Sequence, residues 1–218
     1  MGKMNSIETF TLEARELKLD FFEFSLIEDE GLTPYIIGDL HLHDKEGKYL
    51  DTYNIKIEIK EDYPKSFPVV YETSRRIPVN IDWHVFPDGH CCIVTPPEEF
   101  LICKKRISLE QFIIKYLLPY FHNQLFREIE GYFLNERSHG HKGIKEFFFD
   151  IFNTKKSENI SDWLFFIAKG KEPDRTADCF CGSKKKYRKC HREAFRELSL
   201  FSIKDLLYYS ALIKVDKT

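Results

Sequence analysis

The chain has 218 residues and a mass of 26.0 kDa, enough for one medium domain with an appendage or for two small domains. Hydrophobic residues make up 43% of it and 20 residues are Phe, a composition that excludes general disorder. The formal charge of −2 excludes a global basic field for nucleic acid, and the apolar runs are too short to span a bilayer.

The first third of the chain predicts a helix followed by an antiparallel meander. Residues 7–29 are rich in Glu, Leu and Phe and predict a helix that runs into a strand near Phe22–Ile27. A second strand is expected at Tyr35–His43. In Tyr53–Lys60 apolar and polar residues alternate strictly, which is typical of a strand with one buried face. A further short strand, Val69–Thr73, follows a proline-bracketed turn.

The middle of the chain predicts a long irregular loop and then a helix. Residues 76–107 contain four prolines and no long periodic segment. Ser108, with Gln111 three residues later, forms a capping box that predicts a helix start. Pro119 is expected to kink or divide this helix. A heavily aromatic helix is predicted at 143–152, before a polar linker.

A cysteine cluster near the C-terminus has the spacing of a metal site. The stretch "DCFCGSKKKYRKCHR" contains Cys-x-Cys, eight residues, and then Cys-His. Three thiolates and an imidazole (Cys179, Cys181, Cys190 and His191) complete a tetrahedral donor set for Zn²⁺, with no position open for a substrate. Six Lys or Arg residues between 184 and 192 would offset the charge of such a site or contact nucleic acid. Thiols packed in a small core are the weaker alternative, because the segment has few other apolar residues.

This stretch resembles the zinc motif at the C-terminus of the SecA preprotein translocase, which is also appended to many bacterial proteins. The matching residues are Cys179, Cys181, Gly182, Ser183, Lys186, Tyr187, Lys189, Cys190 and His191. The resemblance implies a structural Zn²⁺ and a docking surface rather than a catalytic centre.

A second feature is the adjacent pair Cys91 and Cys92, just after a Pro-Asp-Gly turn. A disulfide between neighbours would strain the peptide, and two adjacent thiols alone make a poor metal site. Packing in the core and nucleophilic chemistry remain. Composition alone favours packing, whereas display on irregular backbone near His84 and His90 favours chemistry.

The order of helix, strand meander, Tyr-Pro turn, strand, cysteine loop and capped helix resembles the ubiquitin-conjugating enzyme fold over about residues 7–130. The matching stretches are "YNIKIEIKEDYPKSFPVVYET" and "DGHCCIV", the latter like the Gly-x-x-Cys active site of that family. The resemblance implies an α+β fold of antiparallel meander and flanking helices. By spacing from Gly89, it also implies Cys92 as the nucleophile and Cys91 as core packing.

The chain departs from the eukaryotic pattern upstream of the cysteine. That family carries His-Pro-Asn there, and the Asn supports the oxyanion, whereas this chain reads Asp82, Trp83 and His84. An imidazole at His84 would donate one hydrogen bond to an oxyanion. The departure agrees with bacterial relatives, as does "NERSHGHKGIKEF", in which Glu136 and His139 would either approach the site or have a helix-capping or packing role.

The resemblance implies an acyltransferase that carries a protein tail on Cys92 as a thioester and passes it to a target amine. The tail would belong to a ubiquitin-like protein or, as in CBASS antiphage systems, to a cyclic-nucleotide synthase. The chain has no Gly-rich nucleotide loop, so a separate activating enzyme or preactivated partner is implied. The alternatives are an inactive conjugating fold that binds the tail without turnover, and a nucleic-acid adaptor built on the zinc motif, although nucleic acid is not the expected partner.

We expect a cytoplasmic protein with reduced cysteines and no membrane contact, because the N-terminal segment does not read as a secretory leader. The predicted segments are a conjugating-enzyme-like domain over 1–152, a linker and short helix over 153–176, a zinc motif over 177–192 and a C-terminal helix over 193–218.

Overall fold

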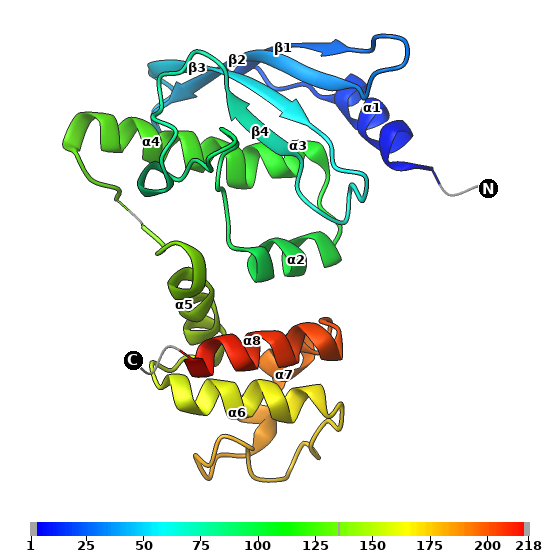
Figure 1. The fold of residues 1–218 in the computed structure, drawn as a ribbon, viewed down its shortest axis with the longest axis vertical. Coiled ribbons are helices and arrows are strands. Elements are labelled where there is room, and N and C mark those ends of the chain that lie inside the picture. Colours follow the sequence, from blue (N-terminus) through cyan, green and yellow to red (C-terminus); the bar gives the residue numbers. More distant parts are fainter. Residues whose placement is uncertain (1–3, 135, 216–218) are drawn as a thin grey trace. The chain divides into compact units, whose positions relative to one another are not determined.

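The computed structural model in Figure 1 describes residues 4–134 and 136–215. The chain forms two compact units, unit 1 over Met1–Glu136 and unit 2 over Arg137–Thr218. The sequence placed the end of the first domain near residue 152. In the structure the units divide at residue 136, so helix α5 (Gly140–Phe152) belongs to unit 2.

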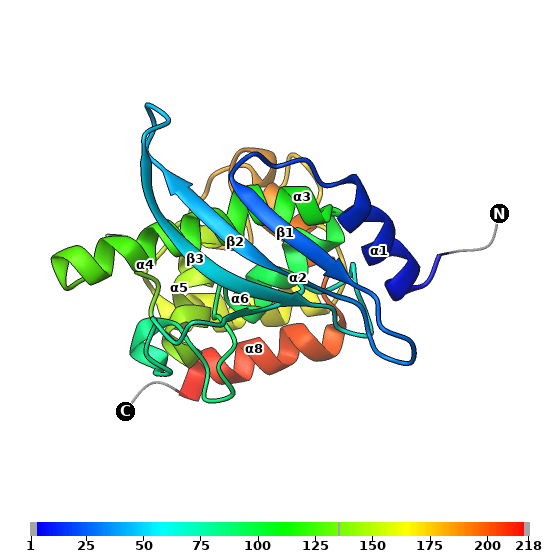
Figure 2. The ribbon, with the colours of Figure 1, turned by 90° about the horizontal axis from the view of Figure 1, so that it is seen from above.

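Unit 1 is α+β and is built on a four-stranded antiparallel sheet in the order β1-β2-β3-β4. The strands are β1 (Phe22–Ile27), β2 (Tyr35–His43), β3 (Tyr49–Glu58) and β4 (Val69–Glu72). The alternation of β3 fixes its orientation, because Tyr53, Ile55 and Ile57 are fully buried while Asn54 is exposed. The predicted meander is therefore confirmed (Figure 2).

Helices supply the other layer of the core in unit 1. Helix α1 (Ser6–Glu16) begins at a capping box between Asn5 and Glu8. The segments α3 (Leu109–Phe112), a π-helical turn (Ile113–Leu117) and α4 (Leu118–Glu130) form one continuous rod, seen beneath the strands in Figure 2. Buried side chains of α1, the rod and the inner sheet face form a single hydrophobic cluster.

The start of this rod agrees with the sequence, whereas Pro119 is accommodated next to a π-helical turn without a break in the rod. The hydroxyl oxygen of Ser108 accepts a hydrogen bond from the Gln111 N–H at 3.2 Å. Pro119 lies in the first turn of α4, directly after the π-helical turn. A proline cannot donate to the preceding turn, and the wider π turn accommodates this.

The prediction of an irregular loop at 76–107 was wrong in part. This region contains helix α2 (Pro96–Lys104) and a 3₁₀ turn, η1 (Ile81–Trp83). The two prolines that argued against a helix occupy the first turn of α2, where a backbone N–H has no intrahelical partner to lose.

The described part of unit 2 is mainly helical. Its helices are α5, α6 (Ser157–Ala168), α7 (Arg192–Leu198) and α8 (Ile203–Val215). The hydroxyls of Ser161 and Ser210 each donate to the other's backbone carbonyl at 2.8 Å, which joins α6 to α8 in a buried contact. Helix α6 begins at Ser157, within the segment that was predicted as a polar linker. The single helix predicted over 193–218 is two helices, α7 and α8. In the described residues, no helix is both long and apolar enough to cross a membrane.

Candidate metal centre and cysteine loop

The four predicted metal ligands converge in unit 2. One ligand atom from each of Cys179, Cys181, Cys190 and His191 lies within 4.8 Å of all the others. Cys179 is buried and the other three are half-buried. The side chains thus form a cluster that could hold a metal ion.

The spacing of the donors fits a tetrahedral cation. The distance from His191 Nδ1 is 3.4 Å to the sulfur of Cys179 and 3.4 Å to that of Cys190, and the sulfurs of Cys181 and Cys190 are 3.6 Å apart. Zinc bonds of about 2.3 Å to sulfur and about 2.0 Å to nitrogen give tetrahedral edges of roughly 3.8 Å and roughly 3.5 Å. The donor set therefore fits Zn²⁺ in number, type and size.

A short hairpin presents the first two cysteines. The N–H of Cys179 donates to the carbonyl of Lys185 at 2.9 Å, and the N–H of Gly182 donates to the carbonyl of Cys179 at 3.1 Å. Gly182 has a φ of +76°, a conformation that a residue with a side chain rarely adopts. The 3₁₀ turn η3 (Tyr187–Lys189) then returns the chain, so that Cys190 meets the first pair.

A hydrogen bond to a residue distant in the sequence orients the ring of His191. Its Nε2 donates to the carbonyl of Phe152, at the end of α5, at 3.0 Å. This bond places the hydrogen on Nε2 and leaves Nδ1 free to face the thiols, as expected for a metal ligand. The rings of Trp163 and Phe180 pack against the imidazole at centroid distances of 5.0 and 5.7 Å.

The thiols of the cluster differ in acidity. Burial raises the pKa of Cys179 to about 12. Burial opposes ionisation of Cys181 as well, yet hydrogen bonds from Ser183 and the neighbouring thiols outweigh it and lower the pKa to about 6. A bound cation would favour the thiolate form of all three cysteines.

In unit 1, Cys91 and Cys92 lie in different environments. Cys91 is 6% exposed, belongs to the hydrophobic core, and donates its N–H to the carbonyl of Val70 in β4 at 2.8 Å. Cys92 is half-buried and donates its N–H to the carbonyl of His84 at 2.8 Å. The expected packing role of Cys91 is confirmed by its burial, and the nucleophilic role of Cys92 stays a prediction.

Side chains from α4 hold the loop that precedes the cysteines. Three of them donate hydrogen bonds to three successive backbone carbonyls at the end of η1, which have no helical partner of their own. The pairs are Arg127 with Asp82, Gln124 with Trp83 at 2.8 Å, and Tyr120 with His84 at 2.9 Å. The donors recur at intervals of four and three residues and therefore share one face of the helix. This ladder, the α4 ladder below, was not predicted, because its two sides are about 40 residues apart.

His84 contacts Cys92 through its backbone. Its φ of 53° is left-handed, a conformation in which His is more common than most residues with a side chain. The ring packs edge-on against Phe133 at a centroid distance of 4.8 Å, and a carboxylate oxygen of Glu136 lies within 4.8 Å of a ring nitrogen. His139, the other residue expected near this site, is at the N-cap of α5 in unit 2.

The surroundings of Cys92 disfavour the thiolate. Burial raises the pKa of this thiol to about 11, and the negative charge of Glu99 contributes to the rise. Glu99 is itself held by the N–H of Phe67 at 2.9 Å and by the ammonium group of Lys60 at 3.2 Å. At pH 7 the thiolate is therefore roughly one part in 10⁴, and the loop favours a neutral sulfur.

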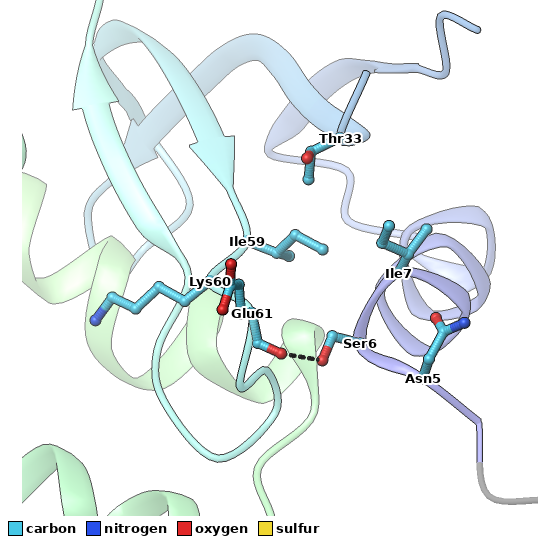
Figure 3. A pocket seen from close by; sticks show the side chains of 7 residues that line it. All are labelled: Asn5, Ser6, Ile7, Thr33, Ile59, Lys60 and Glu61. Atoms are coloured by element: carbon cyan, nitrogen blue, oxygen red, sulfur yellow. Dashed lines mark hydrogen bonds between the residues drawn. The ribbon is translucent and has the colours of Figure 1, made fainter. Parts of the chain in front are cut away.

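A separate cavity of about 290 Å³ lies between the N-terminus of α1 and the chain that leaves β3 (Figure 3). Ile7 and Ile59 face each other across it, and the hydroxyl of Ser6 donates to the carbonyl of Glu61 at 2.6 Å. Its lining includes neither Cys92 nor His84, so it is distinct from the cysteine loop.

Comparison with known proteins identifies the cluster in unit 2. The family model of the SEC-C motif, a motif of the zinc-binding type, matches residues 175–193. This range contains all four clustered ligands, so the predicted motif is confirmed by an independent comparison. No curated protein matches the chain.

Proposed function

We propose that unit 1 is a thioester-forming enzyme of the ubiquitin-conjugating type. It would carry the C-terminus of a ubiquitin-like protein, or of a cyclic-nucleotide synthase in bacterial antiphage defence, on Cys92 and transfer it to an amine. The observation that carries this proposal is the division of two adjacent thiols, one in the core and one half-buried on a loop held by α4. The antiparallel meander with a preceding helix and a following helical rod also supports it.

In the proposed reaction, the sulfur of Cys92 attacks the thioester carbonyl of an activated donor. The new carbon–sulfur bond forms as the donor's thiol leaves with the proton that Cys92 gives up. A target amine then attacks the same carbonyl, and Cys92 leaves as a thiol. Burial penalises the thiolate but not a neutral thioester, so the environment of Cys92 favours the acylated enzyme over the ionised one.

We further propose that the cluster in unit 2 holds one structural Zn²⁺. Its four protein donors leave no open position, which favours a role in folding over catalysis. The hydrogen bond from His191 to Phe152 would couple this metal to the end of α5.

One observation favours a second function for unit 1. A thiol whose pKa is raised to about 11 is not an activated nucleophile, as expected for a module that binds a protein tail without turnover. Covalent capture of the donor separates the two functions.

The test incubates each variant with an activating enzyme and a tail donor, and then compares gels with and without reductant. We expect wild type to form an adduct that reductant removes, Cys92→Ser to form a reductant-resistant ester or none, and Cys91→Ala to keep the adduct. An adduct that persists in Cys92→Ala but is lost in Cys91→Ala would show that Cys91 is the nucleophile. No adduct in wild type would favour the binding module.

The contribution of His84 is testable with two substitutions. If its imidazole donates to the oxyanion, His84→Ala should slow transfer roughly 10²-fold, a loss of about 3 kcal/mol. His84→Asn tolerates the left-handed backbone and keeps a donor, so it should retain most of the rate. Equal rates per folded molecule in all three proteins, with lowered melting temperatures in the variants, would make His84 a structural residue.

A further inference from the structure

The small net charge of the chain conceals two units of opposite sign. Unit 1 contains 15 Lys and Arg against 24 Asp and Glu, a formal charge of −9. Unit 2 contains 18 against 11, a formal charge of +7. A basic unit of this kind attracts polyanions even though the whole chain is slightly acidic.

Much of this positive charge lies on the segment over residues 175–193, which contains the four clustered ligands and is called the metal-binding loop below. Six cations there are exposed, and within the described residues five of them form no ion pair. These five residues, the basic face below, are Arg175, Lys184, Lys185, Arg188 and Lys189. Their neighbours differ, because Lys186 pairs with Asp178 at 3.0 Å and Arg196 pairs with Glu172 at 2.9 Å.

Compensation of the metal site does not account for the basic face. Three thiolates, a neutral imidazole and a divalent cation carry a net charge of about −1. One nearby ammonium group would offset this, and the five cations exceed it several-fold. The excess is directed to solvent, where it raises the local concentration of anions.

The chemistry of the face favours phosphate over protein. Among the described residues, no large hydrophobic side chain between Phe165 and Leu200 is exposed, so the metal-binding loop presents none to solvent. Protein interfaces are centred on aromatic and aliphatic side chains and are depleted in Lys. Nucleic-acid backbones, in contrast, are bound mainly by Lys and Arg.

We propose that the basic face of unit 2 binds the phosphodiester backbone of nucleic acid without reading its sequence. The face offers charge at several successive positions of one loop, and among the described residues it has no exposed aromatic ring on which a base would stack. Binding by such a face is electrostatic, depends steeply on salt, and does not involve Cys92.

The test measures fluorescence anisotropy of labelled probes of mixed sequence, about 20 nucleotides long, with the full, zinc-loaded chain. Single-stranded RNA, single-stranded DNA and duplex DNA are compared at about 50 and about 200 mM salt. If all five cations contact phosphates, binding of the single strands should weaken about a hundredfold over this range. Absence of binding at the lower salt concentration would overturn the proposal.

A matched pair of variants locates the site. The triple substitution Lys184→Gln, Lys185→Gln and Lys189→Gln should weaken binding at least about tenfold. The control removes three exposed cations elsewhere in unit 2, by Lys155→Gln, Lys156→Gln and Lys204→Gln, and should stay within about twofold of wild type. Zinc content is measured in both, so that loss of the metal is not mistaken for loss of the face.

Two results would contradict the assignment. Equal weakening in both triple variants would mean that the total charge of unit 2, and not this face, attracts the probe. Competition by poly-glutamate at the same charge concentration as RNA would mean that an acidic protein is the better partner. Neither result bears on thioester formation at Cys92, so this proposal and the enzymatic one fail separately.

Discussion

At the scale of single residues, the adjacent thiols of Cys91 and Cys92 lie in different environments. Successive side chains on extended backbone point to opposite sides. The side chain of Cys91 is therefore buried in the core, while that of Cys92 is only half-buried. Burial raises the pKa of the Cys91 thiol to about 12, although the Tyr120 hydroxyl interacts with this thiol and opposes the rise. If Cys92 is the nucleophile, as proposed, its selectivity would therefore arise from accessibility and not from a large difference in acidity.

We expect the alkylation rate of Cys92 by iodoacetamide to rise about tenfold per pH unit from about pH 7 to about pH 10. A pKa of about 11 keeps the thiolate a minor species over this range, so the rate follows its population. Glu99→Gln should raise the rate at fixed pH, because it removes a negative charge that opposes ionisation. Fragment-ion mapping of the labelled peptide distinguishes Cys92 from Cys91, and a plateau below about pH 9 would show an activated thiol.

Single residues also show what the sequence could and could not predict. The Cys179, Cys181, Cys190 and His191 cluster was predictable because its members lie close together in the sequence, with the spacing of a metal-binding motif. The carbonyl of Phe152, which orients the ring of His191, was not predictable, because any residue at the end of α5 supplies the same group. The backbone contact of His84 with Cys92 escaped prediction for the same reason.

At the scale of elements, the rod beneath the sheet has two tasks. Its inner side chains fill the core, while the α4 ladder holds the backbone before Cys92. The side chain of Gln124 is 1% exposed, and a buried polar side chain costs free energy unless it is hydrogen-bonded. The carbonyl of Trp83 accepts a hydrogen bond from its Nε2, whereas its buried Oε1 has no hydrogen-bond partner among the described residues.

We expect Tyr120→Phe to loosen this loop while leaving the rod intact. The change removes the hydrogen bond to the carbonyl of His84, which is worth about 1 kcal/mol of unfolding free energy, and also the interaction of the hydroxyl with the Cys91 thiol. Loss of this anchor should also raise the alkylation rate of Cys92 at fixed pH. Tyr116→Phe in the same rod is the control, because the structure shows no hydrogen bond from that hydroxyl among the described residues. Unchanged alkylation in Tyr120→Phe would mean that the α4 ladder does not control access to Cys92.

The elements themselves were partly predictable. Alternation identified the strands, since one buried face repeats every second residue. Helix α2 was missed because it has only nine residues and starts with two prolines, a pattern that also describes a loop. Only the structure shows that this segment is a helix with Leu101 and Cys103 buried.

At the scale of the whole molecule, opposite charge distinguishes the two units more clearly than composition does. A count over all 218 residues gives −2, and only the division at residue 136 reveals values of −9 and +7. The boundary was not evident from the sequence, because α5 is aromatic and resembles a core helix of the first domain. Its aromatic side chains instead serve unit 2, where Phe152 packs against Trp163 and His191.

The two units should respond differently to loss of metal. A structural Zn²⁺ contributes its binding free energy to the folding of the segment that it holds, so removal should destabilise unit 2 and spare unit 1. We expect purified protein to contain about one zinc per chain, and Cys179→Ser with Cys181→Ser to release it. Hydrogen exchange should then increase in the loop over 175–193 and at the end of α5, which the bond from His191 to Phe152 joins to the site. Exchange in β2 and β3 should stay at the wild-type level, which serves as the internal control. Full zinc occupancy in the double variant would exclude these ligands, and equal loss of protection in both units would show that they do not fold independently.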